Sequence, residues 1–284
     1  MLANLNDVLL PAQKRRYAVG LFNCVTLEMT RGIFQAAEKL NAPVIVGTAE
    51  ILLGSASLQE VADMVIDRAK RSTVPVVLHY DHGLTYEKCM EAMDLGYTSI
   101  MYDCSTASYE ENLKNLAEMV KIAHSRNITV EGELGHVGDN EGKGKLSRPE
   151  DYYTDPEKAV EFVEKTGVDA LAIAVGNAHG DYKFPPKLDF DRISEIHRKV
   201  AVPLVLHGGS GLSDDDFRKA VLCGISKVNI FTDIDKAQAS AMKEAWDAGV
   251  RSAFSMVPAE VEAIQKVVER KMLLFGSEGH GIEA

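Results

Sequence analysis

Three histidines have the residue type and the spacing for a metal site: His82, His179 and His207. Each follows a short apolar run that is typical of a buried strand, at residues 74–78, 170–175 and 202–206. If these strands lie parallel in one sheet, the three imidazoles reach the same edge of it. A single histidine is more often a core or capping residue. Three converging imidazoles with a fourth position free, however, are the ligand set of a catalytic zinc ion.

Other polar residues also stand at the ends of the expected strands, where a purely structural core would have apolar ones. Asp81 could exchange a proton with a substrate hydroxyl, or accept a hydrogen bond from a ligand imidazole. Glu131 and Glu133 share one face of a strand, where they could approach the metal or pair with a buried Lys or Arg. Asn23 and Asn229 end two further strands. The remaining histidines lack such support: His79, His124, His136, His197 and His280.

A glycine-rich turn follows His207 and precedes an expected helix. Gly208, Gly209 and Ser210 could expose backbone N–H groups to a phosphate, although a plain turn has the same composition. Thr232 stands at the start of the next helix and could donate to the same group. In barrel enzymes these two loops are the usual phosphate cradle, so the pattern indicates sugar-phosphate chemistry at a metal.

Eight apolar, strand-like runs alternate with helical patterns along the whole chain. The expected strands are 18–22, 44–47, 76–79, 99–102, 129–133, 170–174, 204–207 and 227–230. The expected helices are 26–40, 58–71, 86–95, 109–126, 156–166, 190–199, 214–223, 233–248 and 258–275. Continuous apolar strands between helices indicate a parallel sheet covered on both sides. Eight such units predict an α/β fold, a single-domain (β/α)8 TIM barrel over residues 1–284 with a C-terminal helix, rather than a doubly wound open sheet.

The composition narrows the class of protein. The 284 residues are 46% apolar, and a net charge of −11 without a basic tract argues against nucleic acid as a partner. Four scattered cysteines form no CxxC pair, which indicates a reducing compartment. Residues 1–16 are a mixed polar segment without the apolar core of a signal peptide, and no apolar run is long enough for a membrane span. We therefore expect a cytoplasmic protein without a membrane partner.

Two segments are long for loops, residues 134–155 and 175–188. The first carries four glycines, which is typical of an active-site lid, so we expect 134–155 to be a mobile active-site loop. A solvated connection would have the same composition. Glu141, in this segment, is by composition one more charged loop residue.

The chain resembles the class II (metal-dependent) ketose-bisphosphate aldolases, the family of the fructose- and tagatose-bisphosphate aldolases. The resemblance runs from Tyr17 to Ser277. Its most specific blocks are the Asp81-His82-Gly83 turn, the run 131–135, the loop 176–180 with its histidine, and the run 206–211. The family fold is a (β/α)8 barrel, in agreement with the strand and helix pattern.

The resemblance implies a role for each candidate residue. His82, His179 and His207 match the family's zinc ligands, and Glu133 matches an alternative metal contact. Asp81 matches the acid/base that serves the C4 hydroxyl of the sugar. The implied cofactor is one Zn²⁺ per chain, with a monovalent cation near the phosphate in many relatives.

The substrate contacts are implied in the same way. Glu141 matches the loop carboxylate that moves the carbon-bound proton at C1, and Asn229 matches the residue that steadies the enediolate. The expected substrate and phosphate contacts are Asn23, Gly180, Gly208, Gly209, Ser210 and Thr232.

The implied reaction is reversible cleavage of a ketose 1-phosphate or ketose 1,6-bisphosphate to dihydroxyacetone phosphate and an aldehyde, a carbon–carbon lyase step of glycolytic type. One alternative is the same mechanism with a shorter or non-phosphorylated aldehyde. Another is a non-catalytic sugar-phosphate-binding barrel. The partner is thus a small sugar phosphate, and relatives suggest a homodimer or homotetramer.

Several positions depart from the family pattern, mainly at the aldehyde end. Ala49 stands where many relatives have a Ser for the distal phosphate, and Phe231 where fructose-specific relatives have an Asp. The usual distal-phosphate Arg has no clean counterpart, Arg251 being the nearest candidate, and Asp139 replaces a common loop glycine. A Schiff-base aldolase would need a lysine at a strand end, whereas Lys227 opens its strand. A zinc hydrolase would more typically have an Asp at the end of the eighth strand.

Overall fold

Eight parallel strands close into a barrel in the computed structural model, which describes residues 1–135, 138–139, 152–179 and 187–281. Each barrel strand pairs with the next in sequence, and β11 pairs with β2 to close the ring. The predicted TIM barrel is therefore confirmed. The barrel strands are β2 (Val19–Asn23), β3 (Val44–Ala49), β4 (Val76–Gly83), β5 (Ser99–Tyr102), β6 (Thr129–Leu134), β8 (Ala170–Ile173), β10 (Leu204–Leu206) and β11 (Ile225–Ile230).

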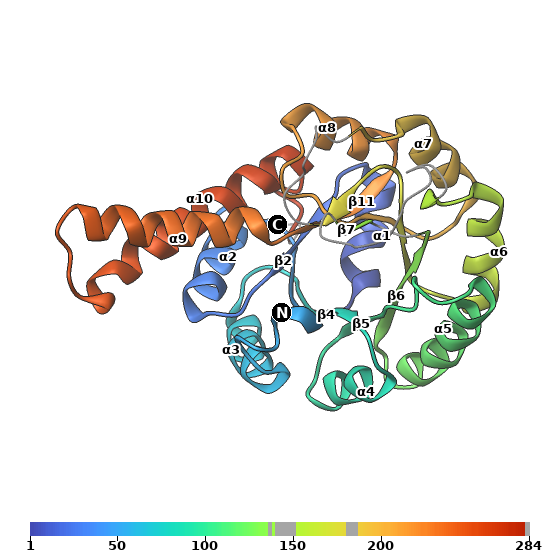
Figure 1. Cartoon of the computed structure of the whole chain (residues 1–284), viewed down its shortest axis with the longest axis horizontal. Helices are drawn as coiled ribbons and strands as arrows, with labels where there is room; N and C mark the ends of the chain where they lie inside the picture. Colours follow the sequence, from blue (N-terminus) through green and yellow to red (C-terminus); the bar gives the residue numbers. More distant parts are fainter. Residues whose placement is uncertain (136–137, 140–151, 180–186, 282–284) are drawn as a thin grey trace.

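Helices surround the barrel, and one follows each barrel strand (Figure 1). Their starts are fixed locally: in α3, for example, Ser57 and Glu60 form a reciprocal capping box that satisfies two free N–H groups. One turn of 3₁₀ helix, η1 (Glu50–Leu52), lies between β3 and α3. The helices are α2 (Leu27–Lys39), α3 (Leu58–Arg71), α4 (Tyr86–Asp94), α5 (Tyr109–His124), α6 (Pro156–Thr166), α7 (Phe190–Lys199), α8 (Asp214–Cys223) and α9 (Thr232–Asp247).

Side chains along each strand alternate between the surrounding helices and the barrel interior. On β4 the interior positions are Val77, His79 and Asp81, in that order toward the carboxyl end. On β11 they include Lys227 and then Asn229. The interior is therefore apolar at the amino end of the strands and polar at the carboxyl end.

The amino end of the barrel is closed by α1 (Leu5–Arg15), a helix that the sequence analysis did not predict. Its buried side chains are Leu5, Val8, Leu9 and Ala12, which pack against the apolar interior residues of the strands. This spacing of three, four and seven residues is a helical pattern. The sequence analysis missed this helix because residues 1–16 are, taken together, a mixed polar segment. Before α1, β1 (Leu2–Ala3) pairs with the first two residues of β4.

The last helix, α10 (Ala253–Phe275), forms an antiparallel hairpin with α9 that projects away from the barrel (Figure 1). It starts five residues before the expected position, so Pro258 lies inside the helix, as its sixth residue, rather than at its first position. Within the hairpin, Gln238 donates to Glu260 over 2.8 Å. Trp246 and Phe254, near its far end, are 54% and 86% exposed. None of the described helices is long and apolar enough to cross a membrane.

Candidate active site

Asp81 and His82 are neighbours on β4, yet both side chains face the same polar cluster. A regular strand would point them to opposite faces. The backbone of His82 is left-handed, with φ of 47°, and the register between β4 and β5 shifts between Tyr80 and Gly83. This bulge re-aims His82 toward the interior at the cost of local strain, which non-glycine residues rarely accept.

Asp81 is held by two amides. Asn23 donates to its Oδ2 over 2.9 Å, and Asn229 donates to its Oδ1 over 3.1 Å. The carboxylate is 2% exposed, and each of its oxygens therefore has a fixed direction. Burial alone would raise the pKa of Asp81, but the positive charges of His82, Lys227 and His207 hold it well below its ordinary value. Asp81 is thus an ionised carboxylate in this arrangement.

His207 follows β10 and lies between two glutamates of β6. Its Nε2 is 2.8 Å from Glu131 Oε1, and its Nδ1 is 3.2 Å from Glu133 Oε2. Burial would lower the pKa of His207, but these two carboxylates raise it to about 10. The two carboxylates beside His207 also favour a metal cation, which would take the place of a proton on the imidazole.

His82 has a carboxylate partner as well. Its Nδ1 lies 2.7 Å from Oδ2 of Asp103, which follows β5, so its other nitrogen is directed elsewhere. An imidazole oriented by a carboxylate in this way is the usual support of a metal ligand. The rings of His82 and His207 meet edge to face, with centroids 4.6 Å apart. Sequence reasoning missed Asp103, whose only signal was its place after the fourth expected strand.

The possible ligand atoms form overlapping groups. One atom each from Asp81, His82 and His207 lies within 4.8 Å of the others, and the same holds for His82, Asp103 and Glu133. Imidazole and carboxylate donors suit zinc and other borderline divalent cations. The donor set therefore fits the dication that the sequence predicted.

A second polar layer lies beneath this cluster and was not recognised from the sequence. His79, which was set aside there, is fully buried, with Nδ1 2.7 Å from Ser99 Oγ. Lys227 is also fully buried, with Nζ 2.8 Å from Glu131 Oε2. Glu131 is therefore paired with a buried lysine, which is one of the two roles that the sequence predicted for it. Burial would raise its pKa, but Lys227 and His207 lower it to about 2.

The glycine turn after His207 has the close contacts that glycine permits. Gly208 has φ of 63°, and a Cβ there would lie 2.0 Å from the carbonyl oxygen of Ala178. Ser210 is buried in the same turn. The N-terminus of α8 is already capped by the reciprocal hydrogen bonds of Ser213 and Asp216, so fewer of its N–H groups are left for an anion.

The start of α9 is different, because no side chain caps it. Phe231 is its N-cap residue, and Thr232 is its first helical residue. Uncapped N–H groups and the helix dipole favour an anion there. Arg251 lies beyond the other end of α9, a helix about 24 Å long, with its guanidinium 4.3 Å from the Trp246 ring centroid.

Three predicted site residues are described only in part or not at all. Glu141 and Gly180 lie outside the described residues, as does most of the expected active-site loop 134–155. The backbone of His179 is described: β9 (Ala178–His179) pairs in parallel with β7 (Gly138–Asp139), a small sheet that was not predicted. The side chain of His179 lies outside the description.

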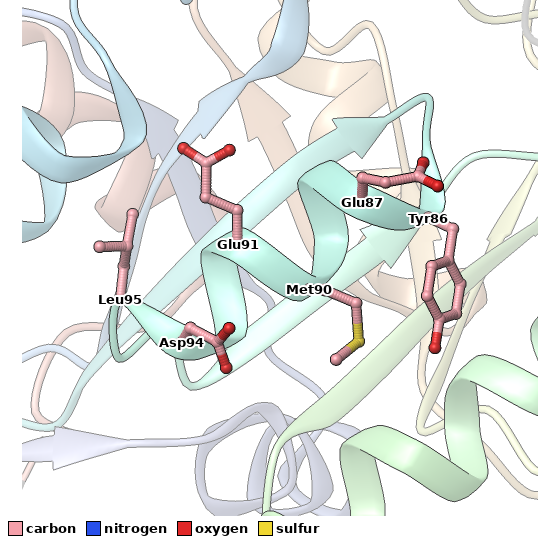
Figure 2. A pocket seen from close by; sticks show the side chains of 6 residues that line it. All are labelled: Tyr86, Glu87, Met90, Glu91, Asp94 and Leu95. Atoms are coloured by element: carbon pink, nitrogen blue, oxygen red, sulfur yellow. The ribbon is translucent and has the colours of Figure 1, made fainter.

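A surface depression of about 450 Å³ lies along α4 (Figure 2). Its lining combines apolar and acidic side chains: Tyr86, Glu87, Met90, Glu91, Asp94 and Leu95. None of these residues belongs to the polar interior of the barrel, so the depression is separate from the candidate site.

Comparisons with known proteins agree with the geometry. The sequence model of the family described as "Fructose-bisphosphate aldolase class-II" matches residues 3–280. The YdjI protein of Escherichia coli K12 is 40% identical over 280 residues, covering 98% of this chain and 99% of YdjI. The crystal structure of that protein, described as the YdjI aldolase, matches with a TM-score of 0.90 at 36% identity, covering 99% and 100% of the two chains. A fructose-bisphosphate aldolase of Staphylococcus epidermidis is 38% identical over 284 residues, covering 97% and 98%.

Proposed function

Because the chain belongs to the class II fructose-bisphosphate aldolase family, we propose that it cleaves a ketose 1-phosphate or ketose 1,6-bisphosphate reversibly to dihydroxyacetone phosphate and an aldehyde. The observation that carries this proposal is the Asp81 carboxylate, fixed by Asn23 and Asn229 within ligand distance of His82 and His207. A base beside a dication site is what retro-aldol cleavage requires.

In the cleavage direction, Asp81 takes the proton of the C4 hydroxyl. The C4–O bond becomes a carbonyl as the C3–C4 bond breaks, and the electron pair stays on the fragment that carries C3. Asn229 lies beside Asp81 and can donate to an oxygen of that fragment. Glu141 is proposed to return the proton to carbon. A bound zinc ion would polarise the ketose carbonyl and stabilise the negative charge that develops.

The proposed zinc ligands are His82, His179 and His207, with Glu133 as an alternative contact. The supporting carboxylates of Asp103 and Glu131 agree with such a role for the first and the last of these histidines. Removing the metal should abolish turnover, whereas a non-catalytic binder would retain sugar-phosphate binding without any turnover.

The proposed phosphate cradle is made by the glycine turn and the start of α9. It comprises Gly180, Gly208, Gly209, Ser210 and Thr232, with Asn23 as a further substrate contact. A monovalent cation beside the phosphate, held by backbone carbonyls, is part of the same proposal.

The two aldolase alternatives differ in the aldehyde product, which either carries a phosphate or is shorter or non-phosphorylated. Ala49 is the register partner of Asp81 on the adjacent strand, so this position borders the acid/base directly. A methyl group there cannot donate a hydrogen bond to a distal phosphate, which supports a shorter or non-phosphorylated aldehyde. Comparable efficiency on fructose 1,6-bisphosphate and on the best alternative substrate would argue against this preference.

We also propose that the chain forms a homodimer or homotetramer. Trp246 and Phe254 expose large apolar side chains on a hairpin that lies off the barrel, and a contact between copies of the chain would bury them. Alanine at both positions should lower the mass measured by sedimentation, with Leu10→Ala, an exposed leucine on α1, as the control.

The first experiment is a measurement of dihydroxyacetone phosphate release from a panel of ketose 1-phosphates and 1,6-bisphosphates, with and without a chelator. Chelator-sensitive release supports the metal aldolase, and borohydride trapping of the substrate would instead indicate a Schiff base. No release from any sugar by the zinc-loaded protein would overturn the proposed reaction.

A further inference from the structure

A buried lysine connects the two halves of the candidate site. Lys227 lies in the barrel interior with no exposed surface. Its Nζ is 2.8 Å from Glu131 Oε2 on β6 and donates to Asn229 Oδ1 over 2.7 Å. A buried ammonium is costly unless it is paired and hydrogen-bonded, so its position is held from both sides.

The contact of Lys227 with Asn229 decides how the Asn229 amide is oriented. A lysine ammonium has only donors, so the oxygen end of the amide must face it. The NH₂ end then faces Asp81, to which it donates over 3.1 Å. The amide thus transmits the position of Lys227 to the carboxylate that is proposed to take the substrate proton.

The contact of Lys227 with Glu131 decides how His207 is oriented. Oε2 of Glu131 lies against Lys227, which turns Oε1 toward His207 Nε2 at 2.8 Å. With Nε2 engaged, Nδ1 is the nitrogen that faces Glu133. Glu131 thus selects which nitrogen of His207 is directed toward the proposed metal site.

We propose that Lys227 is a positioning residue that sets both the acid/base and one metal ligand, through Asn229 and Glu131. This inference rests on the proposed aldolase function for its kinetic part alone. The Lys227 ammonium contacts Asn229, which contacts Asp81. It also contacts Glu131, which contacts His207. Loss of Lys227 should therefore affect cleavage and zinc affinity together, each through a different neighbour.

The test is a pair of double-mutant cycles with Lys227→Met, which keeps the length and apolar stem of the side chain. Alone it should lower kcat by about 10- to 100-fold with a smaller change in KM, and weaken zinc binding by a similar factor. In an Asn229→Ala background most of the kcat effect should disappear. In a Glu131→Gln background most of the zinc effect should disappear, because contacting groups are not additive.

Lys227→Arg should recover part of both effects, since it restores a buried cation. Ile264→Ala, which opens a cavity where α10 packs against Gly32 of α2, serves as the control for lost stability. It should lower the unfolding temperature and leave kcat and zinc affinity unchanged.

Additive effects in both cycles, or Lys227→Met losing stability alone as Ile264→Ala does, would overturn the positioning role. Zinc affinity is measured by chelator competition on the unreacted protein, so it does not depend on the substrate. If the wild-type protein released no dihydroxyacetone phosphate, the aldolase proposal would fail. The zinc cycle would still decide the role of Lys227.

Discussion

The two ends of the barrel interior are made by the same strands from opposite kinds of residue. At the amino end, Val77 of β4 packs with Leu9 of α1 in a wholly apolar cluster. Four residues further along β4, Asp81 lies among imidazoles, amides and carboxylates. The comparison teaches that one scaffold separates its tasks along the strand axis, with apolar burial at one end and chemistry at the other.

The separation also explains how so many buried charges are tolerated. The carboxyl end buries Glu131, Glu133 and Asp81, with Lys227 and His207 as the facing cations. Buried ion pairs contribute little net stability. The apolar end, together with the layer between strands and helices, therefore carries the stability of the fold. Changes at the two ends should have distinct signatures.

The largest effect is expected from Asp81→Ala. Loss of a positioned acid/base should lower kcat by about 10²- to 10⁴-fold, while zinc stays bound. Steady-state cleavage rates and metal content measure both quantities. Asp67→Ala, which removes an exposed carboxylate of α3, is the control and should change neither. Unchanged turnover in Asp81→Ala would remove this residue from the mechanism.

The matching change at the apolar end is Leu9→Ala. A cavity beneath the barrel should lower the free energy of unfolding by about 2–5 kcal/mol, measured by urea titration. Its kcat at 25 °C should stay within about twofold of wild type, because no polar residue moves. Leu10→Ala, on the exposed side of the same helix, should change neither quantity. A large loss of kcat in Leu9→Ala would show that the two ends are coupled.

Zinc should stabilise the protein through the polar end alone. At a free concentration of 100 times its dissociation constant, a ligand that binds only the native state raises the free energy of unfolding by about 2.7 kcal/mol. Urea titration of chelator-treated protein, with and without zinc, measures this gain. The gain should persist in Leu9→Ala and vanish in His207→Ala. A gain that survives in His207→Ala would place the metal elsewhere.

The smallest effect is expected from Asp103→Asn. This change keeps a partner for His82 but removes its charge, and should weaken zinc binding about 10- to 100-fold. Chelator competition measures the affinity. Asp94→Asn, which alters an exposed ion pair with Arg126, should leave the affinity as it is. Equal affinities for Asp103→Asn and wild type would mean that His82 needs no orienting carboxylate.

Much of the fold was accessible from the sequence, because each barrel strand is a continuous apolar run between two amphipathic helices. All eight strands and the eight helices after them were predicted at nearly their observed positions. The first helix was missed, since Leu5, Val8 and Leu9 are diluted by polar neighbours that face solvent. Only the closed barrel offers the apolar opening that this helix fills.

Site residues could be predicted from the sequence only where they stand at the end of an expected strand. That rule brought Asp81, His82 and His207 together, and the structure places them in one cluster. It could not find Lys227 or His79, which lie one layer deeper within their strands. The ion pair of Lys227 with Glu131 joins two strands that are far apart in the sequence, and no local pattern records such a pairing.

Because β11 closes the barrel, the site can form only after this last barrel strand has been synthesised. Asn229 reaches Asp81 across a sequence separation of 148 residues, on the strand that is made last. A growing chain that lacks β11 therefore has an open edge on β2, and its future base has no second amide. The site can be completed only after the chain has been synthesised through β11, which ends at Ile230 of 284 residues, and until then the exposed edge must be kept from pairing with other chains.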